Sequence, residues 1–330
     1  MKDIIVTLGI IAYNEEKYLP QLLRNIVEQT YPINKIEIVL VDGKSEDDTL
    51  KIMKKFAEDN TNFLNVKVCI NEKRTQPSGW NVVIKQMTGD ILIRIDSHAL
   101  IPNDFVKKNV ECIERGEFVC GGPRTNIIDE NTRWKRVLLA AEQSLFGSGI
   151  APYRRDKSIE YVKTVFHAAY HREVIETVGL FNEELLRTED NEYHYRVRKH
   201  GYKICYDHNI SSSYQTRNSL KKMIKQKYSN GLWIGKTIWK CPGCISLFHL
   251  VPCVFVLSLI ISMFLFLLQT KWIFIFLVLL YMCICFILMI SCWLKDVRNY
   301  FQVCLMFIFP ILHISYGIGT IVGIFKGLKW

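Results

Sequence analysis

No aspartate or glutamate occurs between His208 and Lys295, although the chain of 330 residues carries 32 acidic residues. This acid-free stretch holds two apolar runs, at 247–268 and 272–293, and each could cross about 30 Å of hydrocarbon as a helix. Because the runs are apolar on every side, they indicate membrane helices rather than helices of a water-soluble protein. A third run at 300–325 contains Pro310 and several glycines, so we expect either a kinked span or a pair of helices that enters and returns.

A signal sequence is also missing, because Met1 to Thr7 leads directly into an expected strand. The N-terminal part is therefore expected to stay in the cytoplasm. The net charge of +10 is concentrated before the first apolar run, which fits the positive-inside rule and attraction to anionic lipid head groups. The basic residues concerned are Arg217, Lys221, Lys222, Lys225, Lys227, Lys236 and Lys240. Since no nucleic-acid recognition fold accompanies them, we expect membrane lipids and not nucleic acid as the partner.

The cysteines show no disulfide pattern, because the 11 of them are scattered and several lie in the apolar runs. This usage is typical of a reduced compartment. Cys241 and Cys244 have the spacing of a zinc knuckle, but no second pair follows at zinc-site distance. We therefore interpret this segment as a turn before the membrane.

The first hundred residues alternate apolar runs with amphipathic segments, as parallel α/β folds do. Strands are expected at 4–11, 37–41, 66–70 and 91–95, and helices at 18–29, 48–60 and 78–87. A helix at 104–114 and a strand at 118–121 follow, then a poorly patterned stretch to about residue 163 and a helix from about Glu189. The sequence thus predicts an α/β domain with a mostly parallel sheet.

Polar residues follow three of the expected strands. Tyr13 and Glu15 come after the first strand, Asp42 after the second, and Asp96 with His98 after the fourth. Ligands of open α/β sheets bind at the carboxyl ends of strands, so we expect these groups to converge on one crevice.

Each group has a chemical and a plainly structural interpretation. Asp42 could accept hydrogen bonds from a base or ribose, whereas Asp47 nearby is adequately explained as a helix cap. Asp96 and His98 point the same way from an extended segment, and their carboxylate and imidazole suit Mg²⁺ or Mn²⁺. Asp190 has two interpretations. It either supplies the negative charge that the dipole favours in the first turn of a helix, or takes a proton from a hydroxyl group.

Taken together and in order, these segments resemble family 2 glycosyltransferases with the GT-A fold. The segments are Ile-Ala-Tyr13-Asn-Glu15-Glu, the strand end at Asp42, Ile-Arg-Ile-Asp96-Ser-His98-Ala, Val178-Gly-Leu-Phe181-Asn-Glu and Thr188-Glu-Asp190-Asn-Glu192. The sequence is most similar to the succinoglycan-biosynthesis (ExoA-like) group, in which Asp-x-His replaces the common Asp-x-Asp. The resemblance covers about residues 4–236.

The resemblance implies a role for each matched residue. Tyr13, Glu15 and Asp42 would hold the uridine, with Arg74 contacting the nucleotide. Asp96 and His98 would serve the diphosphate and a divalent metal. Asp190 would be the general base of a single inverting displacement, with Glu189 beside it.

Two segments depart from the family. Gln226 and Trp233 loosely resemble the Gln-x-x-Arg-Trp element of processive members, but the arginine and the spacing are lost. We therefore expect the basic segment chiefly to be an interfacial amphipathic helix. Relatives tend to have an acidic residue and a glycine where Lys163 and His167 stand, and this loop, with His167 as an acceptor-side candidate, is expected to line the sugars.

The expected organisation is a GT-A domain at 1–212, a basic interfacial segment at 213–245 and a membrane region at 246–330. The leading hypothesis is transfer of a sugar from a UDP-sugar to a polyprenyl-linked saccharide in surface polysaccharide synthesis, alongside other polysaccharide-assembly proteins. The expected location is the cell membrane, with the catalytic domain on the cytoplasmic side. A polyprenyl-phosphate sugar synthase and a non-catalytic, nucleotide-binding membrane scaffold are the alternatives.

Overall fold

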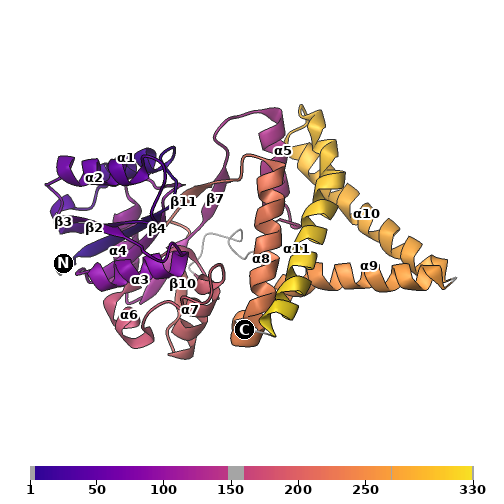
Figure 1. Ribbon diagram of the computed structural model, residues 1–330. Helices are drawn as coiled ribbons and strands as arrows, with labels where there is room; N and C mark the ends of the chain where they lie inside the picture. Colours follow the sequence, from indigo (N-terminus) through magenta and orange to yellow (C-terminus); the bar gives the residue numbers. More distant parts are fainter. Residues whose placement is uncertain (1–3, 148–159, 269, 329–330) are drawn as a thin grey trace. The chain divides into compact units, whose positions relative to one another are not determined.

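The computed structural model describes residues 4–147, 160–268 and 270–328 (Figure 1). Residues 1–3, part of the N-terminal segment in which no signal sequence is expected, lie outside the described residues. The described residues form two compact units. The first contains 4–125 and 160–214, and the second contains 126–147 and 215–328.

The first unit is built on an eight-stranded sheet with the order β3-β2-β1-β4-β9-β6-β10-β8. Four parallel strands form one half: β1 (Val6–Ala12), β2 (Ile36–Asp42), β3 (Asn65–Ile70) and β4 (Ile91–Asp96). In the other half β9 (Phe166–His171) runs antiparallel between β4 and β6 (Val119–Gly122). The edge is made by β10 (Ile204–Tyr206) and β8 (Glu160–Tyr161).

Helices cover both faces of this sheet. Apolar side chains of α1 (Leu19–Val27), α2 (Thr49–Asp59) and α4 (Phe105–Glu114) pack against one face. Those of α3 (Gln76–Gln86), α6 (Arg172–Val178) and α7 (Glu189–Lys199) pack against the other. A small second sheet has the order β5-β11-β7, from β5 (Ala99–Leu100), β11 (Ser212–Gln215) and β7 (Arg124–Ile127).

The expected strands and helices of the first hundred residues are confirmed, with ends that differ by a few residues. The prediction missed β9 and found no element in the poorly patterned stretch, where the structure has β7, α5 (Arg133–Gln143) and β8. The mostly parallel sheet with helices on both faces confirms the predicted fold class.

The second unit is helical. It contains α5, α8 (Leu220–Lys240), α9 (Val251–Leu267), α10 (Lys271–Lys295) and α11 (Leu305–Gly327), joined in part by the short helices η2 (Pro242–Cys244), η3 (Leu247–Leu250) and η4 (Tyr300–Cys304). Three helical segments among the described residues are long and apolar enough to cross a membrane: Leu247–Leu267, Lys271–Lys295 and Tyr300–Gly327. Pro310 lies inside the single helix α11, so the expected pair of short helices is not formed there.

Helices α8 and α11 approach each other closely because glycines face one another. A Cβ atom on Gly231 would lie 2.0 Å from the carbonyl oxygen of Tyr316, and one on Gly323 would lie 2.1 Å from that of Leu232. Residue numbers rise together along the contact, so the two helices run parallel. Small residues permit such close backbone contact between helices.

Candidate active site

The carboxyl ends of the parallel strands carry unusual backbone. Among the described residues, the non-glycine residues with a positive φ are Asn14, Lys44, Arg74 and His167, with φ values of 54°, 59°, 56° and 47°. Asn14, Lys44 and Arg74 follow β1, β2 and β3, and His167 lies at the start of β9. Left-handed backbone costs free energy and is concentrated at functional sites, so this edge of the sheet is the candidate site.

The loops after β1 and β2 interlock. Asn14 accepts from the amide of Glu46 at 2.8 Å, and the amide of Glu15 donates to Thr49 Oγ1 at 2.8 Å. Asp42 is buried and accepts from the Ser45 amide at 3.1 Å. Tyr13 is 48% exposed, so its ring is open to a ligand.

Arg74 lies at the same edge but is loosely held. Its guanidinium Nη1 is 3.8 Å from Glu46 Oε1, and both side chains are exposed. The structure therefore leaves its predicted contact with the nucleotide a prediction.

Asp96 ends β4 and has an imidazole close to it. The Nε2 atom of His167 lies 3.4 Å from Asp96 Oδ2, at an angle that does not make a hydrogen bond, while His167 Nδ1 bonds Ser212 Oγ at 2.8 Å. Burial raises the pKa of Asp96, but His167 and the charges of His98 and Arg124 lower it more, so the pKa lies well below its usual range. A carboxylate that stays ionised is thus available at this strand end.

His98 turns toward the loop after β1. Its Nδ1 atom is 3.1 Å from Glu15 Oε1, and its ring meets Tyr214 edge-on at 4.6 Å between centroids. Both ring nitrogens are buried without a hydrogen-bond partner. A buried imidazole nitrogen without a partner is costly and is free to bind a metal.

The donor set fits a divalent metal that substrate oxygens help to hold. The described residues contain no group of three or more histidine, cysteine or acidic side chains that could hold a metal alone. Mg²⁺ is usually bound by one or two carboxylates together with substrate phosphates and water, and Mn²⁺ also accepts imidazole. Asp96 and His98, whose Nε2 atom makes no hydrogen bond, are the residue types that such a site needs.

The first turn of α7 lies beside the same strand end. Asp190 accepts a hydrogen bond from Arg94 Nη1 at 2.6 Å, and its side chain is 36% exposed. Arg94, Asp96, His167 and Asp190 line one small cavity with Val165, Phe166 and Ala168. The structure therefore brings Asp96, His167 and Asp190 together, and the roles assigned to them stay predictions.

Glu189 differs from its neighbour. It is buried, and its Oε2 atom has no hydrogen-bond partner. Burial, and next the charge of Asp190, raise the pKa of Glu189 well above its usual value. Glu189 is enclosed, whereas Asp190 is partly exposed in the cavity, which favours Asp190 of the two candidates as the group that meets an acceptor.

Sequence reasoning missed Arg94 as a site residue. The signal was a charged residue between Ile93 and Ile95, in a strand that is otherwise apolar and buried. The remaining candidates, Gln226 and Trp233, lie on α8 in the second unit, and their acceptor-side role stays a prediction.

The model of the family described as "Glycosyl transferase family 2" matches residues 7–179. The chain belongs to glycosyl transferase family 2. This membership confirms the resemblance inferred from the motifs, and the chain is a glycosyltransferase by descent.

Relatives of similar length support this membership. The dolichyl N-acetyl-alpha-D-glucosaminyl phosphate 3-beta-D-2,3-diacetamido-2,3-dideoxy-beta-D-glucuronosyltransferase of Methanococcus voltae is 33% identical over 77% of this chain and 80% of the relative. The succinoglycan biosynthesis protein ExoA of Rhizobium meliloti (strain 1021) is 25% identical over 72% of each chain. The mannosyltransferase PcManGT of Pyrobaculum calidifontis, solved with GDP-Man and Mn²⁺, superposes with a TM-score of 0.62 over 96% of this chain and 87% of that one, at 16% identity. The last likeness shows the shared GT-A fold.

Proposed function

We propose that this chain transfers a sugar from a UDP-sugar to a lipid-linked saccharide by a single inverting displacement. The observation that carries the proposal is that Asp96 and Asp190 line one cavity at the carboxyl end of β4. One carboxylate would serve the departing diphosphate and the other the attacking hydroxyl group. The Methanococcus voltae relative, named for transfer to a dolichyl-phosphate sugar, and the Rhizobium meliloti relative, named for succinoglycan biosynthesis, agree with this assignment.

The donor would bind over the ends of β1, β2 and β4. Tyr13, Glu15 and Asp42 would hold the uridine, and Arg74 would reach the nucleotide from the loop after β3. Asp96 and His98 would hold Mn²⁺ or Mg²⁺, which neutralises charge on the diphosphate when it is bound. The Mn²⁺ that accompanies GDP-Man in the Pyrobaculum calidifontis mannosyltransferase supports the same chemistry.

Asp190 would accept the proton of the acceptor hydroxyl. Its Oδ1 atom is engaged by Arg94 at 2.6 Å, which makes Oδ2 the oxygen for the proton. A hydroxyl group is a weak acid, so a positioned base is needed as the new bond forms.

The function is tested by transfer assays in detergent or vesicles. We expect a labelled sugar to move from a UDP-sugar to a polyprenyl-linked saccharide, with no product when the acceptor is omitted. A product formed on bare polyprenyl phosphate would identify a polyprenyl-phosphate sugar synthase instead. Saturable UDP-sugar binding without turnover on any acceptor would favour the non-catalytic scaffold, and transfer from GDP-sugars alone would correct the nucleotide.

We also propose a topology for the second unit, in which α9 and α10 cross the bilayer as a hairpin while α8 and α11 lie in its interface. Lys227 on α8 pairs with Glu142 at 3.0 Å, and Ser315 on α11 bonds the carbonyl of the nearby Ile224 at 3.1 Å. If α11 crossed the membrane, this ion pair would lie beside its middle, at a depth where charges are costly.

The first half of α11 also packs against a polar helix. Leu305, Ile308 and Phe309 share an apolar cluster with Val137 and Leu138 of α5. The same helix carries Arg136, which pairs with Asp296 at 3.0 Å. By contrast, α9 has no charged residue, and α10 has lysines only at its two ends.

This topology predicts which positions are accessible from outside the cell. In intact cells, Lys271→Cys should react with a membrane-impermeant maleimide, because it lies at the tip of the hairpin. Lys295→Cys and Lys326→Cys should react only after permeabilisation. Labelling of the wild-type protein gives the background from its 11 native cysteines. Labelling of Lys326→Cys in intact cells would contradict the interfacial position of α11, and labelling of Lys295→Cys would contradict the hairpin.

A further inference from the structure

Arg94 occupies a position that disfavours charge. It is the fourth residue of β4, and its side chain is only 7% exposed. Ile93 and Ile95, on either side of it, belong to the core on the opposite face of the sheet. Burying a guanidinium without a partner is unfavourable because its charge loses hydration. The groups that contact Arg94 therefore indicate its role.

Asp190 and two aromatic rings compensate for the burial of the Arg94 charge. The Cζ atom of Arg94 lies 4.2 Å from the ring centroid of Trp80 and 4.7 Å from that of Phe181, both within the range of cation–π attraction. Burial lowers the pKa of Arg94, but Asp190 raises it more, so the guanidinium stays charged. The buried charge of Arg94 is thus matched by the carboxylate of Asp190 at 2.6 Å.

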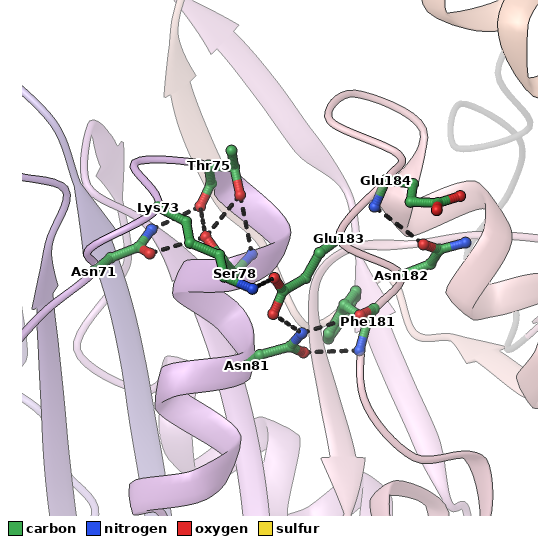
Figure 2. Close-up of polar contacts among 9 residues, drawn as sticks. All are labelled: Asn71, Lys73, Thr75, Ser78, Asn81, Phe181, Asn182, Glu183 and Glu184. Carbon is green, nitrogen blue, oxygen red and sulfur yellow. Dashed lines mark hydrogen bonds and ion pairs between the residues drawn. The ribbon is translucent and has the colours of Figure 1, made fainter. Parts of the chain in front are cut away.

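The backbone of Phe181 is fixed by a clamp of hydrogen bonds between α3 and the segment before α7 (Figure 2). Asn81 donates to the carbonyl of Phe181 at 3.0 Å and accepts from its amide at 2.8 Å. Asn81 also donates to Glu183 at 3.0 Å, and Lys73 pairs with Glu183 at 2.5 Å. Trp80 and Asn81 are neighbours on α3, so the same helix carries one of the two rings and holds the backbone of the other.

Phe181 connects the clamp to the helix of Asp190. Its ring stacks on that of Tyr193, with centroids 4.0 Å apart and planes 15° apart. Tyr193 and Asp190 both lie on α7. Arg94, on β4, thus meets Asp190 with its guanidinium against one ring from α3 and one from the Phe181 segment.

We propose that Arg94 is a positioning residue that fixes the carboxylate of Asp190 in the orientation needed to accept the acceptor proton. This inference rests on the proposed function. Asp190 is a partly exposed side chain on a first helical turn, and the bond from Arg94 to Oδ1 selects one rotamer and aims Oδ2. Displacement of a catalytic group by about 1 Å can cost 10²-fold in rate.

The test compares Arg94→Gln with Arg94→Lys. Arg94→Gln should lower kcat by roughly 10- to 100-fold and leave KM for the nucleotide-sugar within about threefold. Arg94→Lys, which keeps the charge, should recover part of kcat. The matched control is Arg115→Gln, which removes a different Arg–Asp ion pair, with Asp207, in the same unit and should keep kcat.

A double mutant separates positioning from folding. If Arg94 acts through Asp190, then adding Arg94→Gln to Asp190→Asn should lower kcat by less than about threefold more, because coupled residues are not additive. The Asp190→Asn variant and the Arg94→Lys variant keep the test available if Arg94→Gln folds poorly.

The outcomes distinguish the two proposals. Wild-type kcat in folded Arg94→Gln, or full additivity with Asp190→Asn, would overturn the role of Arg94 while the proposed function stood. A loss of kcat in Arg94→Gln that matches its loss of folded protein would also overturn the role of Arg94. A wild-type protein that transfers no sugar to any acceptor would overturn both.

Discussion

Asp190→Asn is expected to lower kcat and kcat/KM together by about 10²–10⁴-fold, the usual contribution of a positioned general base. The carboxamide still presents an oxygen to Arg94, so the 2.6 Å contact becomes a hydrogen bond from a charged guanidinium to a neutral amide, and the melting temperature reports the cost of the lost counter-charge. Affinity for the UDP-sugar should change little, because the uridine is assigned to the loops after β1 and β2. Transfer rate, donor affinity and melting temperature are to be measured on one sample.

The control is Glu192→Gln in the same helical turn. Glu192 pairs with Arg196 at 2.6 Å, so its loss tests the effect of removing an acid from the start of α7. If Asp190 has only a structural role, folded samples of both variants should keep their turnover, and Asp190→Asn should lose stability because the buried Arg94 loses its counter-charge. A folded Asp190→Asn variant with near-normal turnover would end the base assignment and make Glu189→Gln the next variant to test.

The part of the fold that the sequence predicted is the part with local signals. The strands β1, β2 and β4 are nearly continuous apolar runs, as expected for strands buried on both faces. Polar residues stand at the end of β2 and β4 and directly after β1, and parallel strands place those ends at one edge. The convergence of Asp42 and Asp96 at that edge follows from topology rather than from any single motif.

The missed elements depend on contacts between distant residues. The strand β9 reads Phe-His-Ala-Ala-Tyr-His, which has no clear alternation, and it is defined by pairing with β4 and β6 on either side. Helix α5 did carry a local signal, because Thr132 caps it by accepting from the amide of Lys135 at 3.2 Å. That signal lay in a stretch with little apolar periodicity.

His167 is a site residue whose backbone conformation and contact with Asp96 could not be predicted from the sequence. The loop was expected to line the sugars, and the structure brings His167 to 3.4 Å from Asp96. Its φ of 47° is a conformation that favours glycine, which fits the glycine that the family resemblance led us to expect at this position. Neither the strain nor the partner of Arg94 could be read from spacing, because both arise where β4, β9 and α7 meet.

Removal of divalent metal is expected to abolish measurable transfer, and Mn²⁺ or Mg²⁺ should restore it. A metal at a departing diphosphate contributes several kcal/mol to the transition state, and each 1.36 kcal/mol is tenfold in rate, so we expect a loss of at least about 10²-fold. Chelator-treated protein should be compared before and after metal is added back, with the fold monitored by melting temperature. Full activity in the metal-free protein would contradict the assignment of Asp96 and His98.

Asp96→Asn should produce a different defect from Asp190→Asn. Its carboxylate is held ionised beside His167, and the amide replacing it is a weaker metal ligand, so metal-dependent binding of the UDP-sugar should fall as well as turnover. Raising the Mn²⁺ concentration should recover part of the activity, which it should not do for Asp190→Asn. The matched control is Asp104→Asn, whose carboxylate pairs with Lys108 at 2.7 Å on α4 and should leave the metal dependence unchanged. If Asp96→Asn kept wild-type donor affinity at every metal concentration, then Asp96 would not hold the metal, and the crevice would need another ligand for it.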